Sequence, residues 1–319
     1  MYYPYLRGKQ YELIALREFS QEIPDNQYIC PIIEPVKSNL KSLQNAVDIL
    51  RDNGMEFVLI LNPNEGDFKH NNVDLLSNIA GLDHRNKWKP ALLYTNNCSF
   101  LRDFISKKDL ENVVIIFKDG IDFVQDDHLE EFLTSEKERI FAIVNGAADT
   151  RASKHILDHI GIPVIRLDDK FNNQKRNVDY TLIQEEPFTE EPFYYQEDGF
   201  IGFSDYTTLP KNFVEGGMMP YAIAIHITFN GQKETIYIRH FVSDTNTDQK
   251  NIQRKFAEAG RKVMDFFSKH SDYYRGEAIA ELNGYINDGK YPGLGMIKKI
   301  SVKHHLELIS NILGERYEH

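Results

Sequence analysis

Short apolar runs rich in β-branched residues recur along the first two-thirds of the chain, and segments with helical spacing lie between them. Successive runs begin at intervals near the roughly 30 residues of one βαβ unit. We predict a strand in each run, because continuous apolar stretches of this length are typical of strands buried on both faces. The eight predicted strands are Tyr3–Arg7, Ile29–Glu34, Phe57–Asn62, Ala91–Thr95, Val113–Lys118, Ile140–Asn145, Pro163–Asp168 and Phe200–Asp205.

The segment Leu40–Leu50 shows the clearest helical pattern between two of these strands. Its apolar residues recur at i, i+3 and i+7, and Gly54 follows as a stop signal. Parallel strands need long crossover connections, so helices between the strands favour a parallel sheet. The other predicted crossover helices are Leu13–Phe19, the weaker Val73–Ile79, Cys98–Ile105, His128–Leu133 and Ala152–Ile160.

Eight β units within about 205 residues match the period of a (β/α)8 barrel. The alternative is an open doubly wound sheet, which would usually have fewer strands and a glycine-rich first turn. The first turn here, Arg7-Gly8-Lys9-Gln10, is not of that kind. We therefore predict an α/β fold in which residues 1–210 form a (β/α)8 TIM-type barrel.

The pattern changes after the eighth predicted strand. Two β-rich runs, Tyr221–Phe229 and Thr235–Phe241, flank Asn230-Gly231, which is a strong signal for a β-hairpin. Residues 170–198, before the eighth strand, form a less regular excursion. Helical spacing returns at Ile252–Phe267, Glu277–Asn287 and Val302–Leu313. We predict that residues 211–319 form a β-hairpin and helical appendage packed on the barrel.

Composition narrows the class of protein. The 319 residues include 37 basic and 48 acidic side chains, so the net charge of −11 argues against broad attraction to nucleic acid or to an anionic membrane. The two cysteines, Cys30 and Cys98, form no metal or redox motif, which indicates a reducing, cytoplasmic compartment. The chain opens on Met1-Tyr2-Tyr3-Pro4-Tyr5 instead of a signal peptide, and no apolar stretch approaches the roughly 20 residues of a membrane span.

Polar residues end most of the predicted strands. Active sites of such barrels lie at the carboxyl ends of the strands, and side chains two residues apart share a face of a strand. On the second strand, for example, Cys30, Ile32 and Glu34 share one face. The polar residues predicted at the mouth are Arg7, Lys9, Glu34, Asn62, Tyr94, Lys118, Asn145, Arg166, Asp168 and Asp205.

Four of these residues are cations and three are carboxylates, so the predicted mouth is locally positive in an acidic protein. Such a site favours an anionic ligand that carries phosphate or carboxylate. The candidate catalytic residues are Glu34 and Asp205, each as a general base or a metal ligand. The candidate ligand-binding residues are Arg7, Lys9, Asn62, Lys118, Asn145, Arg166, Asp168 and Tyr206.

Several alternatives stay open at this stage. The charged strand ends can instead form ion pairs that only close the barrel. Mg²⁺ or Mn²⁺ is the cofactor that Glu34, Asn62, Asp168 and Asp205 would suit, because both ions accept oxygen ligands. Lys9 is a candidate for Schiff-base chemistry. No sequence motif supports a zinc enzyme or a serine hydrolase.

Three further segments have both a structural and a functional interpretation. His240 and Asp244 end the hairpin and either approach the mouth or belong to a satisfied edge strand. His304-His305 lies in a predicted helix, where neighbouring residues point to different faces and make a poor metal site. Tyr291-Pro292-Gly293-Leu294-Gly295 is a turn into the last helix or an anion-binding helix start.

The chain resembles the phage-type "beta protein" family and its bacterial relatives. The segments that carry the resemblance are the opening Met1–Glu18, Pro31-Ile32-Ile33-Glu34-Pro35, Gly202–Tyr206, His240–Asp244 and Tyr291–Leu308. The family has no assigned activity and occurs in bacteria, phages and mobile elements, often beside nuclease-like genes. The resemblance therefore implies a role in phage–host conflict or antiviral defence, and it implies no catalytic residue.

Two functions follow from these patterns. The first is an enzyme, a phosphodiester or nucleotide hydrolase, in which the mouth cations hold the anion and Glu34 or Asp205 acts as the base. The second is a non-catalytic sensor or scaffold that binds a nuclease-like protein encoded by a neighbouring gene. The expected partners are thus a small anionic ligand or a neighbouring-gene protein.

Overall fold

The computed structural model describes residues 1–70, 73–80, 82, 87–124, 126, 128–146, 151–216 and 219–317. The chain forms two compact units that alternate along the sequence. The first unit comprises Met1–Lys9, Ile23–Asp169 and Tyr194–Asp205, and the second comprises Gln10–Glu22, Lys170–Phe193 and Tyr206–His319. The division into a barrel of residues 1–210 and an appendage of residues 211–319 stays a prediction. Residues 10–22 and 170–193 belong to the same compact unit as the C-terminal third of the chain.

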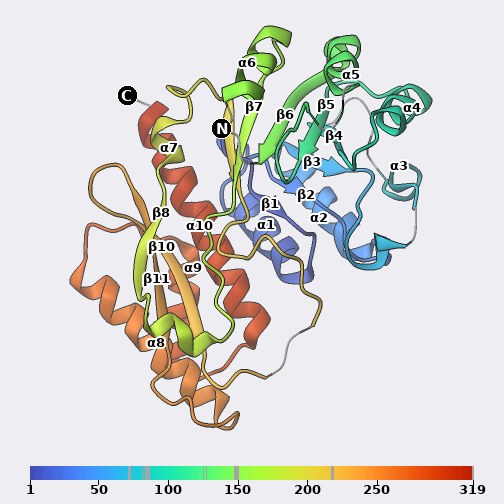
Figure 1. Ribbon diagram of the computed structural model, residues 1–319. Coiled ribbons are helices and arrows are strands. Elements are labelled where there is room, and N and C mark those ends of the chain that lie inside the picture. The colour runs from blue at the N-terminus through green and yellow to red at the C-terminus, as the bar shows by residue number, and fades with distance from the viewer. Residues whose placement is uncertain are drawn as a thin grey trace. The chain divides into compact units, whose positions relative to one another are not determined.

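Eight parallel strands form the sheet of the first unit (Figure 1), in the order β1-β2-β3-β4-β5-β6-β7-β9. Each one overlaps a predicted strand, although β4 begins three residues before the predicted Ala91–Thr95 and ends two residues earlier. Buried strands such as β3 and β5 have no exposed face, which explains why their sequences are apolar throughout. The strands are β1 (Tyr5–Leu6), β2 (Ile32–Ile33), β3 (Phe57–Ile60), β4 (Trp88–Leu93), β5 (Val113–Phe117), β6 (Ile140–Gly146), β7 (Val164–Asp168) and β9 (Gly202–Asp205).

The sheet closes where its first and last strands meet. Tyr2 forms a parallel bridge with Phe203, the Tyr3 N–H donates to the Phe203 carbonyl at 2.8 Å, and the Phe203 N–H donates to the Met1 carbonyl at 3.2 Å. These bonds join β9 to the segment that leads into β1. The predicted (β/α)8 barrel is therefore confirmed, and the open doubly wound sheet is excluded.

Helices of the first unit connect the strands as predicted. Helix α2 turns Leu43, Ala46, Val47 and Leu50 inward, and it ends at Asp52, two residues before Gly54, whose φ of +68° suits glycine. Asn97 caps the start of helix α4, and its side chain accepts a bond from the Phe100 N–H at 2.9 Å. The helices are α2 (Lys41–Asp52), α3 (Leu75–Asn78), α4 (Cys98–Lys108), α5 (Leu129–Ser135) and α6 (Arg151–Ile160), with short 3₁₀ turns η1 (Gly66–Lys69) and η2 (Lys137–Arg139).

The second unit contains a three-stranded antiparallel sheet of order β10-β11-β8. The predicted hairpin is confirmed, because β10 pairs with β11 on either side of Gly231. Strand β8 was not predicted, and it pairs with the free edge of β11. The elements are α1 (Gln10–Glu22), η3 (Asn177–Thr181), β8 (Glu185–Thr189), α7 (Glu191–Tyr194), β10 (Ala224–Asn230), β11 (Ile236–Val242), α8 (Ile252–Lys269), α9 (Glu277–Asn287) and α10 (Leu294–Tyr317).

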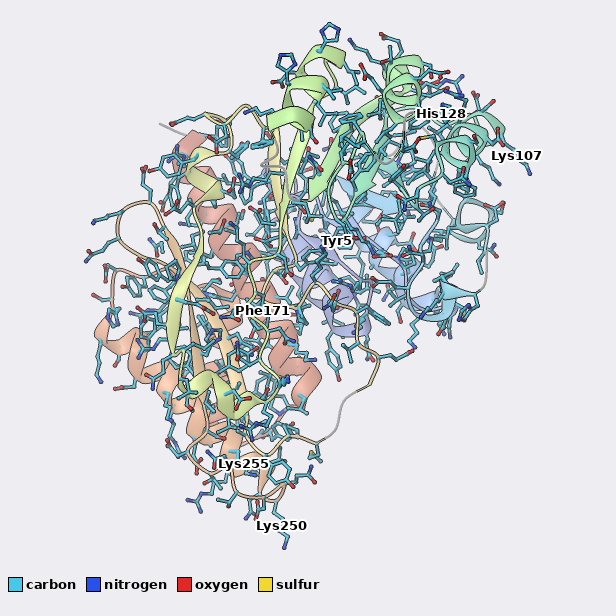
Figure 2. All side chains as sticks on the ribbon, in the orientation of Figure 1. Tyr5, Lys107, His128, Phe171, Lys250 and Lys255 are labelled. Carbon is cyan, nitrogen blue, oxygen red and sulfur yellow. The ribbon has the colours of Figure 1, made fainter. Side chains whose placement is uncertain are left out.

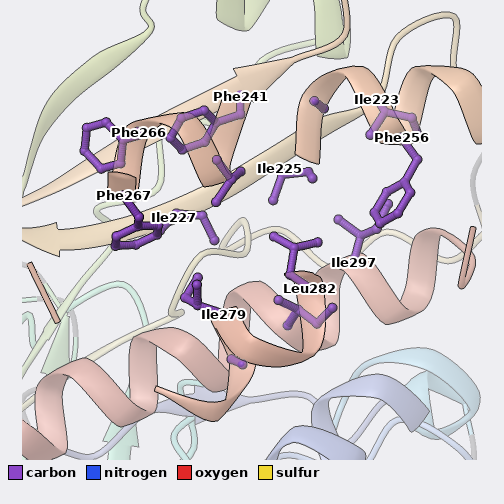
Figure 3. Close-up of a cluster of buried hydrophobic side chains, with 14 of the residues drawn as sticks. Ile223, Ile225, Ile227, Phe241, Phe256, Phe266, Phe267, Ile279, Leu282 and Ile297 are labelled. Atoms are coloured by element: carbon purple, nitrogen blue, oxygen red, sulfur yellow. The ribbon is translucent and has the colours of Figure 1, made fainter. Parts of the chain in front are cut away.

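Helices α8, α9 and α10 bury one face of this hairpin (Figure 3). Ile225 and Ile227 of β10 meet the aromatic rings of α8 and the aliphatic side chains of α9. The fully buried members of the cluster include Ile223, Ile225, Ile227, Val263, Leu282 and Ile300. Among the helices that the structure describes, none combines the length and the apolar character that crossing a membrane requires.

Charged residues also hold helices of the second unit together. Lys299 and Lys303 of α10 are buried and pair with Glu18 at 2.8 Å and with Glu22 at 2.5 Å, both on α1. Glu307 of α10 caps the start of α9, where it accepts a bond from the Ala278 N–H at 3.1 Å. Burial raises the pKa of this carboxyl to about 8. Helix α10 is therefore held by ion pairs as well as by apolar packing.

Gly202 lies at the closure of the barrel, where a larger residue has no room. A Cβ at this position would lie 2.5 Å from Cε2 of Tyr3 and 2.7 Å from the Met1 carbonyl oxygen. We predict that Gly202→Ala lowers the free energy of unfolding by about 1–3 kcal/mol, because the closing strands must separate. Urea unfolding measures this effect. Gly284→Ala is the control, since a Cβ there meets nothing within 4 Å and should raise helix stability by about 1 kcal/mol. An unchanged stability for Gly202→Ala would contradict the proposed tight closure.

Candidate functional site

The carboxylate of Glu34 lies at the centre of the candidate site. Glu34 follows the carboxyl end of β2 and is 0% exposed. Its Oε2 atom accepts hydrogen bonds from the hydroxyl of Tyr5 at 2.6 Å and from Nζ of Lys118 at 2.8 Å. Tyr5 belongs to β1 (Figure 2), and Lys118 directly follows β5. Three strand ends thus supply the groups that meet at this carboxylate.

A second carboxylate, Glu65, joins the same network. One of its oxygens, Oε2, pairs with Nε of Arg7, and the other, Oε1, pairs with Nζ of Lys118, each at 3.2 Å. The exposed fraction of the side chain rises from 0% for Glu34 to 5% for Arg7, 18% for Lys118 and 23% for Glu65. The network therefore leads from the barrel interior toward solvent.

Two glycines position the segments that carry these charges. Gly66 has a φ of +59°, and a Cβ there would lie 2.2 Å from the carbonyl oxygen of Val36. Glycine at this position lets the segment after β3 fold back, with Glu65 near the end of β2. At Gly146 a Cβ would lie 2.2 Å from the carbonyl oxygen of Lys118, so glycine permits the close approach of the ends of β5 and β6.

The Oε1 atom of Glu34 is buried and has no hydrogen-bond partner among the residues that the structure describes. Leaving a buried polar atom unpaired costs about 1–3 kcal/mol, and more for a charged group. Such an atom can accept a proton or a hydrogen bond from a molecule that enters the site. It is the chemical feature that distinguishes this network from a set of satisfied ion pairs.

The structure therefore brings together three of the predicted site residues, Arg7, Glu34 and Lys118. Sequence reasoning missed Tyr5 and Glu65. Tyr5 carries the same strand alternation as Arg7, so that signal was present in the sequence. Glu65 stands in a loop, where no pattern indicated which way its side chain points.

The other predicted mouth residues make their contacts elsewhere. The side chain of Asn62 both donates to the Leu93 carbonyl at 2.9 Å and accepts from the Leu93 N–H at 2.7 Å, so it extends the β3–β4 pairing. The Asn145 side chain accepts a bond from the Ile121 N–H at 3.0 Å. The hydroxyl of Tyr94 donates to Asp126.

Of the predicted charged residues, Arg166 and Asp168 pair with each other at 2.9 Å. Asp205 is buried and accepts a bond from the Tyr2 hydroxyl at 2.5 Å. Burial, and next the Asp205 charge, raise the pKa of Tyr2 well above its usual value. Lys9 is partly buried after β1, and Tyr206 is buried in the second unit.

These contacts can be compared with the positive charge predicted for the barrel mouth and with the predicted Mg²⁺ or Mn²⁺ site. Arg7 pairs with Glu65, and Lys118 pairs with both Glu34 and Glu65, so the formal charges of these four side chains sum to zero. Across the described residues, no group of three or more His, Cys, Asp or Glu side chains is arranged to hold a metal ion. The anion site and the Mg²⁺ or Mn²⁺ site stay predictions.

A cluster of titratable rings lies in the second unit. Nδ1 of His226 on β10 lies 2.7 Å from Nδ1 of His240 on β11, and Nε2 of His240 lies 3.3 Å from Oε1 of Glu186 on β8. Tyr180 and Phe171, the latter labelled in Figure 2, pack against both imidazoles. His240 is thus held by partners within the sheet, but β11 lies between β10 and β8, so the predicted edge-strand position of this histidine is wrong.

The remaining segments singled out in the sequence have structural contacts. Asp244 pairs with Lys262 at 2.6 Å. Nε2 of His304 lies 2.8 Å from the Thr228 carbonyl oxygen, and Nδ1 of His305 lies 3.0 Å from the hydroxyl of the same threonine. Both histidines therefore fasten α10 to β10.

Comparison with known proteins adds little to this picture. No family model matches the chain, and no curated protein matches it. A search of solved structures finds the structure of FabK from Thermotoga maritima, with 11% sequence identity and a TM-score of 0.37, covering 99% of this chain and 94% of that chain. A TM-score this low supports no conclusion about the fold or the function of this chain, so the barrel assignment rests on the strand pairing described above.

The histidine pair predicts a pH dependence of stability. Burial lowers the pKa of His226, with further contributions from His240 and Lys298, and burial lowers the pKa of His240 although Glu186 opposes that shift. An unfolded histidine titrates near pH 6.5. Below that pH the unfolded chain binds protons that the folded pair excludes, so the free energy of unfolding falls as pH falls, by up to about 1.4 kcal/mol per pH unit for each ring.

Urea unfolding between about pH 7.5 and pH 5.5 measures this dependence. We expect His226→Gln to show a smaller loss of stability on acidification than the wild-type chain. The matched control is His155→Gln, which removes an exposed histidine from α6. If His226→Gln kept the wild-type slope, the pair would not be the source of the effect.

Proposed function

We propose that this chain is a cytoplasmic barrel enzyme that binds a phosphate-containing anion and hydrolyses a phosphodiester or a nucleotide. The observation that carries the proposal is the buried Oε1 atom of Glu34, which has no hydrogen-bond partner among the described residues and belongs to a carboxylate that Lys118 contacts at the carboxyl ends of the barrel strands. Active sites of (β/α)8 enzymes lie at that end. Two buried free thiols, Cys30 and Cys98, support a reducing compartment.

Glu34 acts as the general base in this proposal. Its Oε1 atom takes a proton from a water molecule, and the water oxygen forms a bond to phosphorus. The bond from phosphorus to the leaving oxygen then breaks, and that oxygen takes a proton from solvent while Glu34 returns its own proton to solvent. The net reaction adds one water across one P–O bond.

The neighbouring side chains have supporting roles. Arg7 and Lys118 carry the positive charge that stabilises the non-bridging phosphoryl oxygens as charge develops. Tyr5 and Lys118 both donate hydrogen bonds to Oε2 and hold the Glu34 carboxylate in one orientation. The other oxygen, Oε1, then accepts the proton from water. The catalytic role of Asp205, and the ligand-binding roles of Lys9, Asn62, Asn145, Arg166, Asp168 and Tyr206, stay predictions.

Replacing Glu34 tests the enzyme proposal. We predict that Glu34→Gln reduces hydrolysis by about 100- to 10,000-fold, because the amide cannot accept the proton. The assay follows 4-nitrophenolate release from bis(4-nitrophenyl) phosphate and phosphate release from a panel of nucleotides. The melting temperature should change by only a few degrees, because the amide keeps the shape of the side chain. Absence of turnover by the wild-type chain on every substrate would contradict a hydrolase.

We further propose that the protein acts in phage–host conflict, on the strength of its resemblance to the phage-type "beta protein" family. Expression of the gene with its neighbours in a sensitive host should lower the plating efficiency of some phages in a broad panel. Glu34→Gln should restore plating if the hydrolysis is the defence activity. Unchanged plating across the panel, both on expression and on deletion in the native host, would remove the basis for this role.

The second candidate function is a non-catalytic sensor or scaffold for a nuclease-like partner. The balanced charges of Arg7, Lys118, Glu34 and Glu65 favour it, since such a network can close a barrel without any chemistry. It predicts a large loss of stability for Glu34→Gln and co-purification with the neighbouring-gene protein. Native mass spectrometry of the protein from its own host separates the two functions, because it detects either a bound phosphorylated molecule or a stoichiometric second chain.

A further inference from the structure

Glu65 bridges the two cations of the candidate site in the way that a ligand would. Each of its carboxylate oxygens pairs with a different cation, Oε2 with Arg7 and Oε1 with Lys118. A carboxylate or phosphate ligand held by an arginine and a lysine shares its oxygens between them in the same manner. Glu65 therefore lies where an anionic group of a ligand would be bound.

The contacts of Glu65 are weaker than those of Glu34. Both Glu65 distances are 3.2 Å, whereas Nζ of Lys118 lies 2.8 Å from Glu34, and charge-assisted hydrogen bonds are typically about 2.7–2.9 Å long. Glu65 is also 23% exposed, whereas Glu34 is 0% exposed. Water can solvate Glu65 if it leaves the cations, so breaking its contacts costs less than moving Glu34.

The segment that carries Glu65 has irregular backbone. Glu65 lies between the end of β3 and the 3₁₀ turn η1, in the run Asn62-Pro63-Asn64-Glu65-Gly66. The Glu65 carbonyl accepts a bond of η1 from the Phe68 N–H at 3.2 Å, but its side chain extends from a loop, in contrast to Arg7 and Lys118, which border strands. A change of side-chain rotamer is enough to move its carboxylate away from both cations.

We infer that Glu65 occupies the anion position of this site and that a phosphate group binds by displacing it. The inference rests on the proposed function, and it narrows the class of substrate. Without Glu65, the charges of Arg7, Lys118 and Glu34 sum to +1. A dianion is attracted to that site twice as strongly as a monoanion. The site therefore favours a terminal phosphate, as in a nucleotide, over an internal phosphodiester or a carboxylate.

The experiment compares the binding of inorganic phosphate to the full chain and to two variants, by titration calorimetry near pH 8, where phosphate is mainly a dianion. Glu65→Gln should bind phosphate at least about tenfold more tightly than the wild-type chain, because the competing anion is gone. Glu56→Gln is the matched control. It removes another ion-paired glutamate, 2.9 Å from Lys89, at the start of β3, and its affinity should stay within about twofold of wild type.

Each outcome separates this inference from the proposed function. Equal phosphate affinity of the wild-type chain and Glu65→Gln, with turnover of the wild-type chain intact, would overturn the displacement model and leave the enzyme proposal standing. Equal tightening in Glu56→Gln would show a general charge effect and also overturn it. No phosphate binding by any of the three proteins, together with no turnover, would contradict both proposals. Acetate, a monoanion, should bind Glu65→Gln more weakly than phosphate does, and melting curves confirm that each variant is folded.

Discussion

Closure of the eight-stranded sheet is the constraint on which the first unit depends. The backbone of residues 1–3 bonds to Phe203, and the resulting ring turns the ends of β1, β2 and β5 toward one interior. Neighbouring strands are about 4.8 Å apart, so β2 and β5 would be roughly 14 Å apart in a flat sheet. In the barrel, Lys118 after β5 lies 2.8 Å from Glu34 after β2. The candidate site thus exists because the sheet closes.

Burial of the Glu34 carboxylate at the end of β2 requires hydrogen-bond donors and positive charge around it. Removing Glu34 from water is costly, and hydrogen bonds from Tyr5 and Lys118 offset part of that cost. Lys118 in turn contacts Glu65, which also pairs with Arg7. The network has a fixed, fully buried end and an end near solvent. In the function proposed above, the buried carboxylate of Glu34 stays in place for chemistry, and the more exposed carboxylate of Glu65 is the one that a ligand would displace.

The second unit shows that packing does not follow chain order. Helix α1 comes directly after the first barrel strand, yet it binds α10 near the end of the chain. Glu18 pairs with Lys299 and Glu22 pairs with Lys303, and each pair is separated by 281 positions in the sequence. Strand β8 likewise pairs with β11 of the hairpin. These pairings depend on complementary charge and on a free strand edge, neither of which is visible in a local pattern.

The amino-acid sequence by itself determined the eight barrel strands, the crossover helices and the hairpin, because hydrophobic periodicity and turn residues are local signals. It also indicated Arg7, Glu34 and Lys118, since residues at strand ends meet at one edge of a parallel sheet. Tertiary structure alone decided the rest. Strand β8, with Glu185, Glu186 and Pro187, has no strand pattern of its own and forms by pairing with β11. Glu65 enters the site only because the loop after β3 folds back over the barrel end, and the partners of a loop side chain depend on contacts between residues distant in the sequence.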